Sequence, residues 1–107
     1  MMTPQWTKES IFYHIYPLGL CGAPEWNNFS SPVVHNLEKL SPWLDHIQSL
    51  GANAIYLGPV FESTSHGYDL VDYYQVDRRL GDNETLRQFS NKVHQRGMRL
   101  VLDAVFN

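Results

Sequence analysis

Two short segments, residues 52–57 and 98–105, are mostly apolar, and each follows directly after a helical pattern. Strands that are apolar on both faces are typical of parallel sheets, in which both faces are covered. The helical patterns end at Gly51 and Gly97, so only short turns lead into the two strands. Helices joined to strands in this way imply right-handed crossovers, and the sequence therefore predicts an α/β fold with a parallel sheet.

Another strand is expected at residues 11–16, which are rich in aromatic and β-branched residues and end before a proline. Leucine and isoleucine then recur at helical spacing from Leu37 to Ile47. Within this pattern we expect Ser41 to be the N-cap of the main helix and Pro42 to be its first residue.

A second helix is expected to follow an N-cap at Asp82 or Asn83 and to end at Gly97. The connections after the first two strands are long and polar, and residues 62–80 are expected to be irregular. In α/β folds the loops after the carboxyl ends of the strands build the functional site. We therefore expect the site at residues 62–80 and after Asp103.

Composition narrows the class of protein. The chain has 107 residues, of which 43% are hydrophobic and 18% charged, as in a folded domain. Its net charge of −3 offers no basic surface for nucleic acid or for an anionic membrane. The single cysteine excludes an internal disulfide. No segment approaches the ~18 consecutive apolar residues of a membrane span, and no signal peptide is recognised, so we expect a cytoplasmic protein with no membrane or nucleic-acid partner.

Pattern alone leaves two parallel folds open, the (β/α)8 barrel and the doubly wound open sheet. A nucleotide-binding open sheet typically carries a GxGxxG or GxxxxGK[ST] motif after a strand. Neither motif occurs in this chain, which argues against a nucleotide site without choosing between the folds.

Four motifs occur along the chain, and each falls on an expected strand or in the loop after it. They are Tyr13-His14-Ile15-Tyr16-Pro17 and residues 51–60 (GANAIYLGPV), 66–74 (HGYDLVDYY) and 103–107 (DAVFN). In order and spacing they resemble the α-amylase family of glycoside hydrolases. This resemblance implies that residues 1–107 are an N-terminal fragment of a catalytic (β/α)8 barrel domain, with its first three parallel strands and two helices.

The resemblance also implies an activity for the full-length protein. Family members are retaining glycosidases that act on the α-glucosidic bonds of α-glucans or maltooligosaccharides. They use an Asp nucleophile, a Glu acid/base and a second Asp that stabilises the transition state. These residues come from later strands, so no catalytic residue is expected in this fragment, which we expect to be inactive alone. A transglycosylase or isomerase of the same family, and a non-catalytic amylase-like binding or scaffold module, remain open alternatives.

Sugar-binding residues follow from the same resemblance. Tyr68 matches the aromatic platform that stacks on the sugar at the point of cleavage. His66 and Asp69 flank it and are expected to hydrogen-bond sugar hydroxyls. Two alternatives stay open, that Tyr68 only packs a loop and that Asp69 stabilises one. Trp26, on the long loop after the first strand, is either a packing residue or part of an outer sugar subsite.

Two further residues lie near the end of the chain. Asp103 matches the acidic residue that holds an arginine beside the nucleophile in the family, although a carboxylate at a strand end can also cap the next element. Asn107 matches a residue that ligates a structural Ca²⁺ in many members, so calcium is a candidate cofactor. Members that remove single glucose units often carry an acidic residue where this chain has Ser65, which favours an endo-acting or maltooligosaccharide-active enzyme.

Overall fold

Three parallel strands form the main sheet in the computed structural model, which describes residues 11–103. Strand β1 (Phe12–Ile15) pairs with β2 (Ala54–Leu57), and β2 pairs with β5 (Arg99–Leu102). The predicted parallel sheet is confirmed, with each strand shorter than expected. Residues 104 and 105, which the sequence assigns to the last strand, lie outside the described residues.

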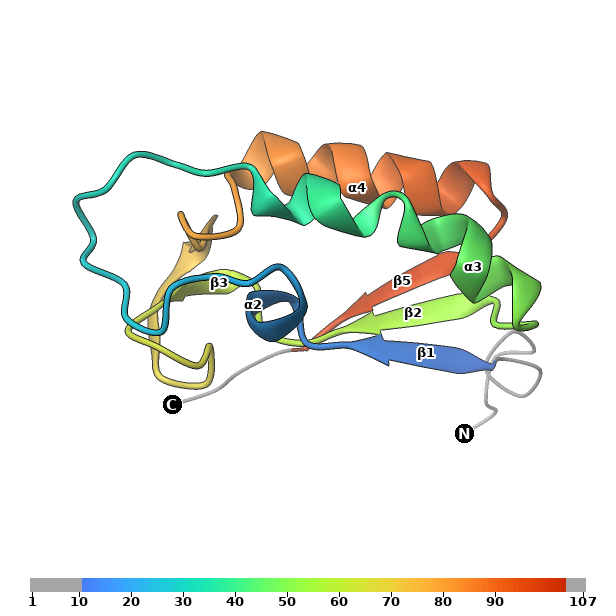
Figure 1. The fold of residues 1–107 in the computed structure, drawn as a ribbon, viewed down its shortest axis with the longest axis horizontal. Coiled ribbons are helices and arrows are strands. Elements are labelled where there is room, and N and C mark those ends of the chain that lie inside the picture. The colour runs from blue at the N-terminus through green and yellow to red at the C-terminus, as the bar shows by residue number, and fades with distance from the viewer. Residues whose placement is uncertain (1–10, 104–107) are drawn as a thin grey trace.

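The helices lie on one face of this sheet (Figure 1). They are the 3₁₀ helix η1 (Asn36–Leu40), α3 (Trp43–Ser49) and α4 (Asn83–Gln95). Their apolar side chains are packed against those of the strands in one core. Its fully buried members include Leu37, Leu40, Leu44, Ile47, Ile55, Leu57 and Val93. The leucines and isoleucines at helical spacing are thus the residues that attach the helices to the sheet.

The first helical region begins differently from the prediction. The helix α3 has Pro42 as its N-cap, and the predicted N-cap Ser41 is instead the C-cap of η1. Ser41 has helical backbone angles, φ −57° and ψ −43°, because the 3₁₀ helix runs into it. An N-cap residue typically has an extended backbone, which neither Ser41 nor Pro42 (φ −63°, ψ −20°) has, so the chain passes from η1 into α3 without a side-chain cap. Gly51 has φ +85°, as expected of the residue that stops the helix.

The predicted second helix is confirmed, together with its N-cap and the glycine that ends it. Asp82 is the N-cap of α4, and its carboxylate accepts a hydrogen bond from the Thr85 N–H at 2.8 Å. Phe89 and Val93 are buried on its apolar side. Gly97 follows the helix with φ +72°.

The expectation that residues 62–80 are irregular is wrong for much of this stretch. Strands β3 (Phe61–Ser63) and β4 (Leu70–Val76) form a separate antiparallel sheet, with register shifts on both sides of Glu62. The β4 segment LVDYYQV is rich in the β-branched and aromatic residues that favour strands. Residues 64–69, between the two strands, and residues 77–80, after them, are irregular as expected.

Two ion pairs, one fully buried and one partly buried, lie at the base of this hairpin. Arg78 Nε donates to Glu62 Oε1 at 2.8 Å. Arg79 donates to both carboxylate oxygens of Asp77 at 2.9 Å, and this pair is 5% and 0% exposed, respectively. Burying a charged side chain costs free energy unless the charge is paired and hydrogen-bonded, and both pairs meet this condition.

All three strands of the main sheet point to the same end, where a short helix α2 (Pro17–Leu20) and the hairpin lie (Figure 1). On the sheet face away from the helices, the rings of His14 and Tyr56 are in edge contact, with centroids 4.9 Å apart. Within residues 11–103, no helix covers this face. In a barrel this would be the inward face. No helix in the described part of the chain is long and apolar enough to span a membrane.

Candidate functional site

The candidate site lies where the loop between β3 and β4 meets the end of β5. The Tyr68 hydroxyl donates a hydrogen bond to Asp103 Oδ2 at 2.8 Å. The Tyr68 residue is nevertheless 49% exposed, so its ring is held by its polar tip and not by burial. This arrangement presents an aromatic surface at the carboxyl end of a parallel sheet.

Asp103 lies beside two phenols. The hydrogen bond to Asp103 is the main cause that raises the pKa of Tyr68 above its ordinary value. Burial, followed by the charge of Asp103, raises the pKa of Tyr56. Both phenols therefore stay protonated at neutral pH, and Tyr68 acts as a hydrogen-bond donor to Asp103.

Gly67 brings the Tyr68 loop against the end of β2. Its φ is +95°, and a Cβ atom at this position would lie 2.6 Å from Pro59 Cβ. A side chain is thus excluded both by the backbone conformation and by space. The backbone preceding Tyr68 is fixed by this close approach.

Asp69 stabilises the same loop. Its carboxylate accepts hydrogen bonds from Ser65 Oγ at 2.7 Å and from the Gly67 N–H at 3.2 Å. Partial burial acts to raise the pKa of Asp69, but these hydrogen bonds and the nearby His66 together lower it below its ordinary value. The charged form of Asp69 is therefore the one that the loop stabilises.

His66 is fixed at both its backbone and its ring. Its carbonyl accepts a hydrogen bond from the Tyr16 hydroxyl, and its Nδ1 accepts one from the Tyr68 N–H at 3.2 Å. Because Nδ1 is an acceptor, the neutral imidazole carries its proton on Nε2. That Nε2–H is a suitable donor for a ligand oxygen.

Four of the five residues expected to bind a ligand or a metal thus gather at one end of the sheet, namely His66, Tyr68, Asp69 and Asp103. The fifth, Asn107, lies outside the described residues. Sequence reasoning missed the contact between Tyr68 and Asp103 and the roles of Tyr16 and Gly67. Gly67 between a histidine and a tyrosine was the one local signal of a constrained loop.

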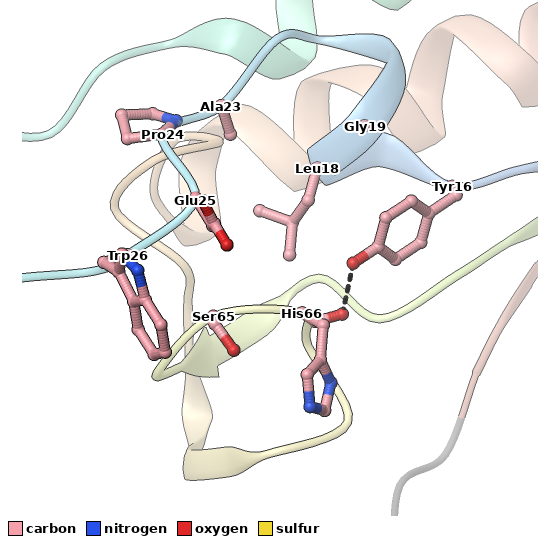
Figure 2. Close-up of a pocket in the computed structure, with 9 residues that line it drawn as sticks. All are labelled: Tyr16, Leu18, Gly19, Ala23, Pro24, Glu25, Trp26, Ser65 and His66. Carbon is pink, nitrogen blue, oxygen red and sulfur yellow. Dashed lines mark hydrogen bonds between the residues drawn. The ribbon is translucent and has the colours of Figure 1, made fainter.

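An open pocket of about 290 Å³ adjoins His66. Figure 2 shows Tyr16 and Trp26 on opposite sides of it, with Leu18 between them. Cys21 is buried near this region, and burial raises the pKa of its thiol to about 11. The thiol is therefore not a nucleophile at neutral pH. Among residues 11–103, no group of three or more His, Cys, Asp or Glu residues is placed to hold a metal ion.

Comparison with known proteins identifies the family. Residues 33–107 match the family model described as the catalytic domain of alpha-amylase. The chain belongs to the α-amylase family. The expected partial (β/α)8 barrel is thereby confirmed, since the three parallel strands and their two helices correspond to part of an α-amylase catalytic domain.

Relatives in the α-amylase family match almost the whole chain. A cyclomaltodextrinase from a Bacillus species is 37% identical over 119 residues, covering 97% of this chain and 21% of the relative. The intracellular maltogenic amylase of Bacillus subtilis is also 37% identical, with 97% and 20% covered. The chain thus spans about a fifth of the length of these relatives.

A solved structure in the same family agrees with the fold. The cyclic α-maltosyl-(1→6)-maltose hydrolase of Arthrobacter globiformis, in complex with that cyclic sugar, has a TM-score of 0.81 and 37% sequence identity. The match covers 100% of this chain and 27% of that one.

Proposed function

We propose that residues 1–107 are the N-terminal part of an α-amylase-type (β/α)8 catalytic barrel. The complete barrel is a retaining glycoside hydrolase that acts on α-glucosidic bonds of α-glucans or maltooligosaccharides. The observation that carries this proposal is the exposed Tyr68 ring, held by Asp103 at the carboxyl end of the sheet. Relatives named for cyclodextrins and maltose products support this substrate class.

In this proposal each residue has a distinct task. The Tyr68 ring stacks on a glucosyl unit, whose C–H bonds are covered by a π-face. The Nε2–H of His66 donates to a sugar hydroxyl. Asp103 positions Tyr68 and, in the complete barrel, an arginine beside the nucleophile. Asp69 keeps the loop in shape and binds sugar through its remaining lone pairs.

The catalytic carboxylates belong to later strands of the barrel, so this segment binds and orients the substrate. An Asp attacks the anomeric carbon and a Glu shuttles the proton in retaining enzymes. What residues 11–103 contribute is a fixed aromatic surface and fixed hydrogen-bonding groups. Such preorganisation lowers the barrier by holding the sugar in a reactive position.

A calcium ion near Asn107 and an intracellular location are also part of the proposal. The described residues supply no cluster of carboxylate and histidine side chains for the ion, so calcium rests on the family resemblance alone. The intracellular location is supported by the name of one relative, an intracellular maltogenic amylase.

The complete barrel that contains this chain tests the proposal. We expect it to hydrolyse maltotriose and longer maltooligosaccharides, and proton NMR of the first product formed to show the α-anomer. Transfer or isomer products in place of hydrolysis would support the transglycosylase or isomerase alternative. Binding without turnover would support a scaffold module. The absence of both binding and turnover would contradict the proposal.

A further inference from the structure

Trp26 is a large aromatic residue that remains 66% exposed in the loop between α2 and η1. A mobile loop can expose a tryptophan by chance, but the residues on both sides of Trp26 are held in place. Arg79 Nη1 donates to the carbonyl oxygens of Pro24 at 2.9 Å and Glu25 at 3.2 Å. On the other side, the Asn27 N–H donates to the Thr64 carbonyl at 2.8 Å.

The side chain of Asn27 adds a second attachment. It is buried and donates to Glu62 Oε1 at 2.7 Å and to the Ser63 carbonyl at 2.9 Å. The guanidinium of Arg79 is itself fixed by the buried Asp77. The loop is thus tied to the hairpin immediately before and after Trp26, and the indole is exposed from a fixed backbone.

The exposed indole forms one wall of the pocket beside His66. Figure 2 shows the Glu25 side chain directed into this pocket, between Trp26 and the Leu18 side chain. The pocket thus combines aromatic and aliphatic walls with a carboxylate acceptor. A pyranose ring offers an apolar face and hydroxyl donors, which match these two kinds of surface.

The pocket adjoins the candidate site at His66. His66 lines the pocket, and its ring centroid lies 6.2 Å from that of Tyr68. A saccharide chain that lies on Tyr68 and extends past His66 would therefore enter the pocket that Trp26 lines.

We propose that this pocket is an outer subsite for a second glucosyl unit of the same α-glucan, with Trp26 as its stacking surface and Glu25 as its acceptor. This inference rests on the proposed function. Trp26 is a specificity-determining residue in it, since it is reached only by substrates long enough to span both Tyr68 and the pocket. Arg79 and Asn27 are positioning residues that act through the loop.

The test measures kcat/KM of the complete barrel for maltooligosaccharides from the shortest cleaved one to maltohexaose. Trp26→Ala is expected to lower the value roughly tenfold for the longer substrates and to leave the shortest within about twofold. Trp26→Phe keeps a smaller ring and is expected to fall between Trp26→Ala and wild type. Trp43→Ala, which removes an exposed tryptophan from α3, is the control and should change none of the values.

Equal losses on short and long substrates, or no loss on either, would overturn the subsite. The subsite would also be overturned if Trp26→Ala and Trp26→Phe both lowered the melting temperature and left kcat/KM unchanged. That result is expected of a residue that packs against another part of the barrel. If the wild-type barrel hydrolyses nothing, the proposed function fails and calorimetry decides the subsite. Maltohexaose must then bind wild type more tightly than it binds Trp26→Ala. No binding to wild type, or equal binding to the two proteins, would overturn the subsite.

Discussion

The Tyr68 hydroxyl and Asp103 Oδ2 are 2.8 Å apart, although 35 positions separate the two residues in the chain. This hydrogen bond joins the loop of the hairpin to the end of β5, and so links two of the four motifs on which the family resemblance rests. It also makes the phenol a fixed part of the site, because a free tyrosine ring that is half exposed would sample several rotamers.

The first prediction concerns the Tyr68 ring in the complete barrel. Tyr68→Ala removes the stacking surface, and we expect kcat/KM on maltooligosaccharides to fall by roughly tenfold to a thousandfold. Tyr68→Phe keeps the ring but loses the hydrogen bond to Asp103, so its loss should be smaller. Steady-state kinetics with a thermal melt of each variant provides the measurement. A destabilised Tyr68→Ala enzyme with wild-type kcat/KM would show that the ring only packs a loop.

The second prediction concerns Gly67. An alanine there adds backbone strain at φ +95° and a Cβ atom 2.6 Å from Pro59 Cβ, so the loop must shift and carry Tyr68 with it. We expect Gly67→Ala to lower both the melting temperature and kcat/KM. Gly97→Ala is the matched control, because Gly97 has φ +72° but open space around it. Gly97→Ala should lower the melting temperature and leave kcat/KM unchanged. An equal loss of kcat/KM in both variants would contradict the idea that Gly67 positions Tyr68.

Much of this fold was predictable because its elements carry local signals. The α4 helix has an N-cap, an apolar stripe and a terminal glycine, all within the element itself. The hairpin was missed because β3 has only three residues and because apolar and polar residues do not alternate along β4 (LVDYYQV), so neither strand shows the period of two.

The polar contacts of the site were less predictable. Residue types at positions 66–69 indicated a sugar site through the family resemblance, yet the partner of Tyr68 depends on how two distant segments meet. The same holds for the carbonyls bound by Arg79, which lie 55 and 54 positions away. Such pairs are set by the tertiary fold and leave no periodic trace in the sequence.

The third prediction concerns the buried pair of Asp77 and Arg79. Asp77→Ala leaves a buried guanidinium without its carboxylate, which typically costs about 3–5 kcal/mol of unfolding free energy. Asp45→Ala removes the partner of Arg96 at the surface and serves as the control, with an expected change within about 1 kcal/mol. Urea unfolding of the complete barrel measures both. Similar small changes in the two variants would mean that the hairpin does not depend on this pair.

The fourth prediction is a pH dependence at the start of α4. Hydrogen bonds from the Thr85 N–H and hydroxyl lower the pKa of Asp82 below its ordinary value. Since the folded pKa is the lower one, this stabilisation is present above the unfolded pKa of about 3.9 and is lost as pH falls through the folded pKa. Asp82→Asn keeps an N-cap that does not titrate. We expect wild type to lose more stability than Asp82→Asn between about pH 6 and about pH 3, and parallel losses would contradict this assignment.

The central claim is that this segment supplies the aromatic sugar platform of an α-glucan-active barrel. The most direct measurement is a crystal structure of the complete barrel with a bound maltooligosaccharide. We predict a glucosyl ring lying on the face of Tyr68, with carbon atoms at about 4 Å, and the Tyr68 hydroxyl still bonded to Asp103. A sugar bound away from Tyr68, or a Tyr68 ring covered by other protein segments, would contradict the claim.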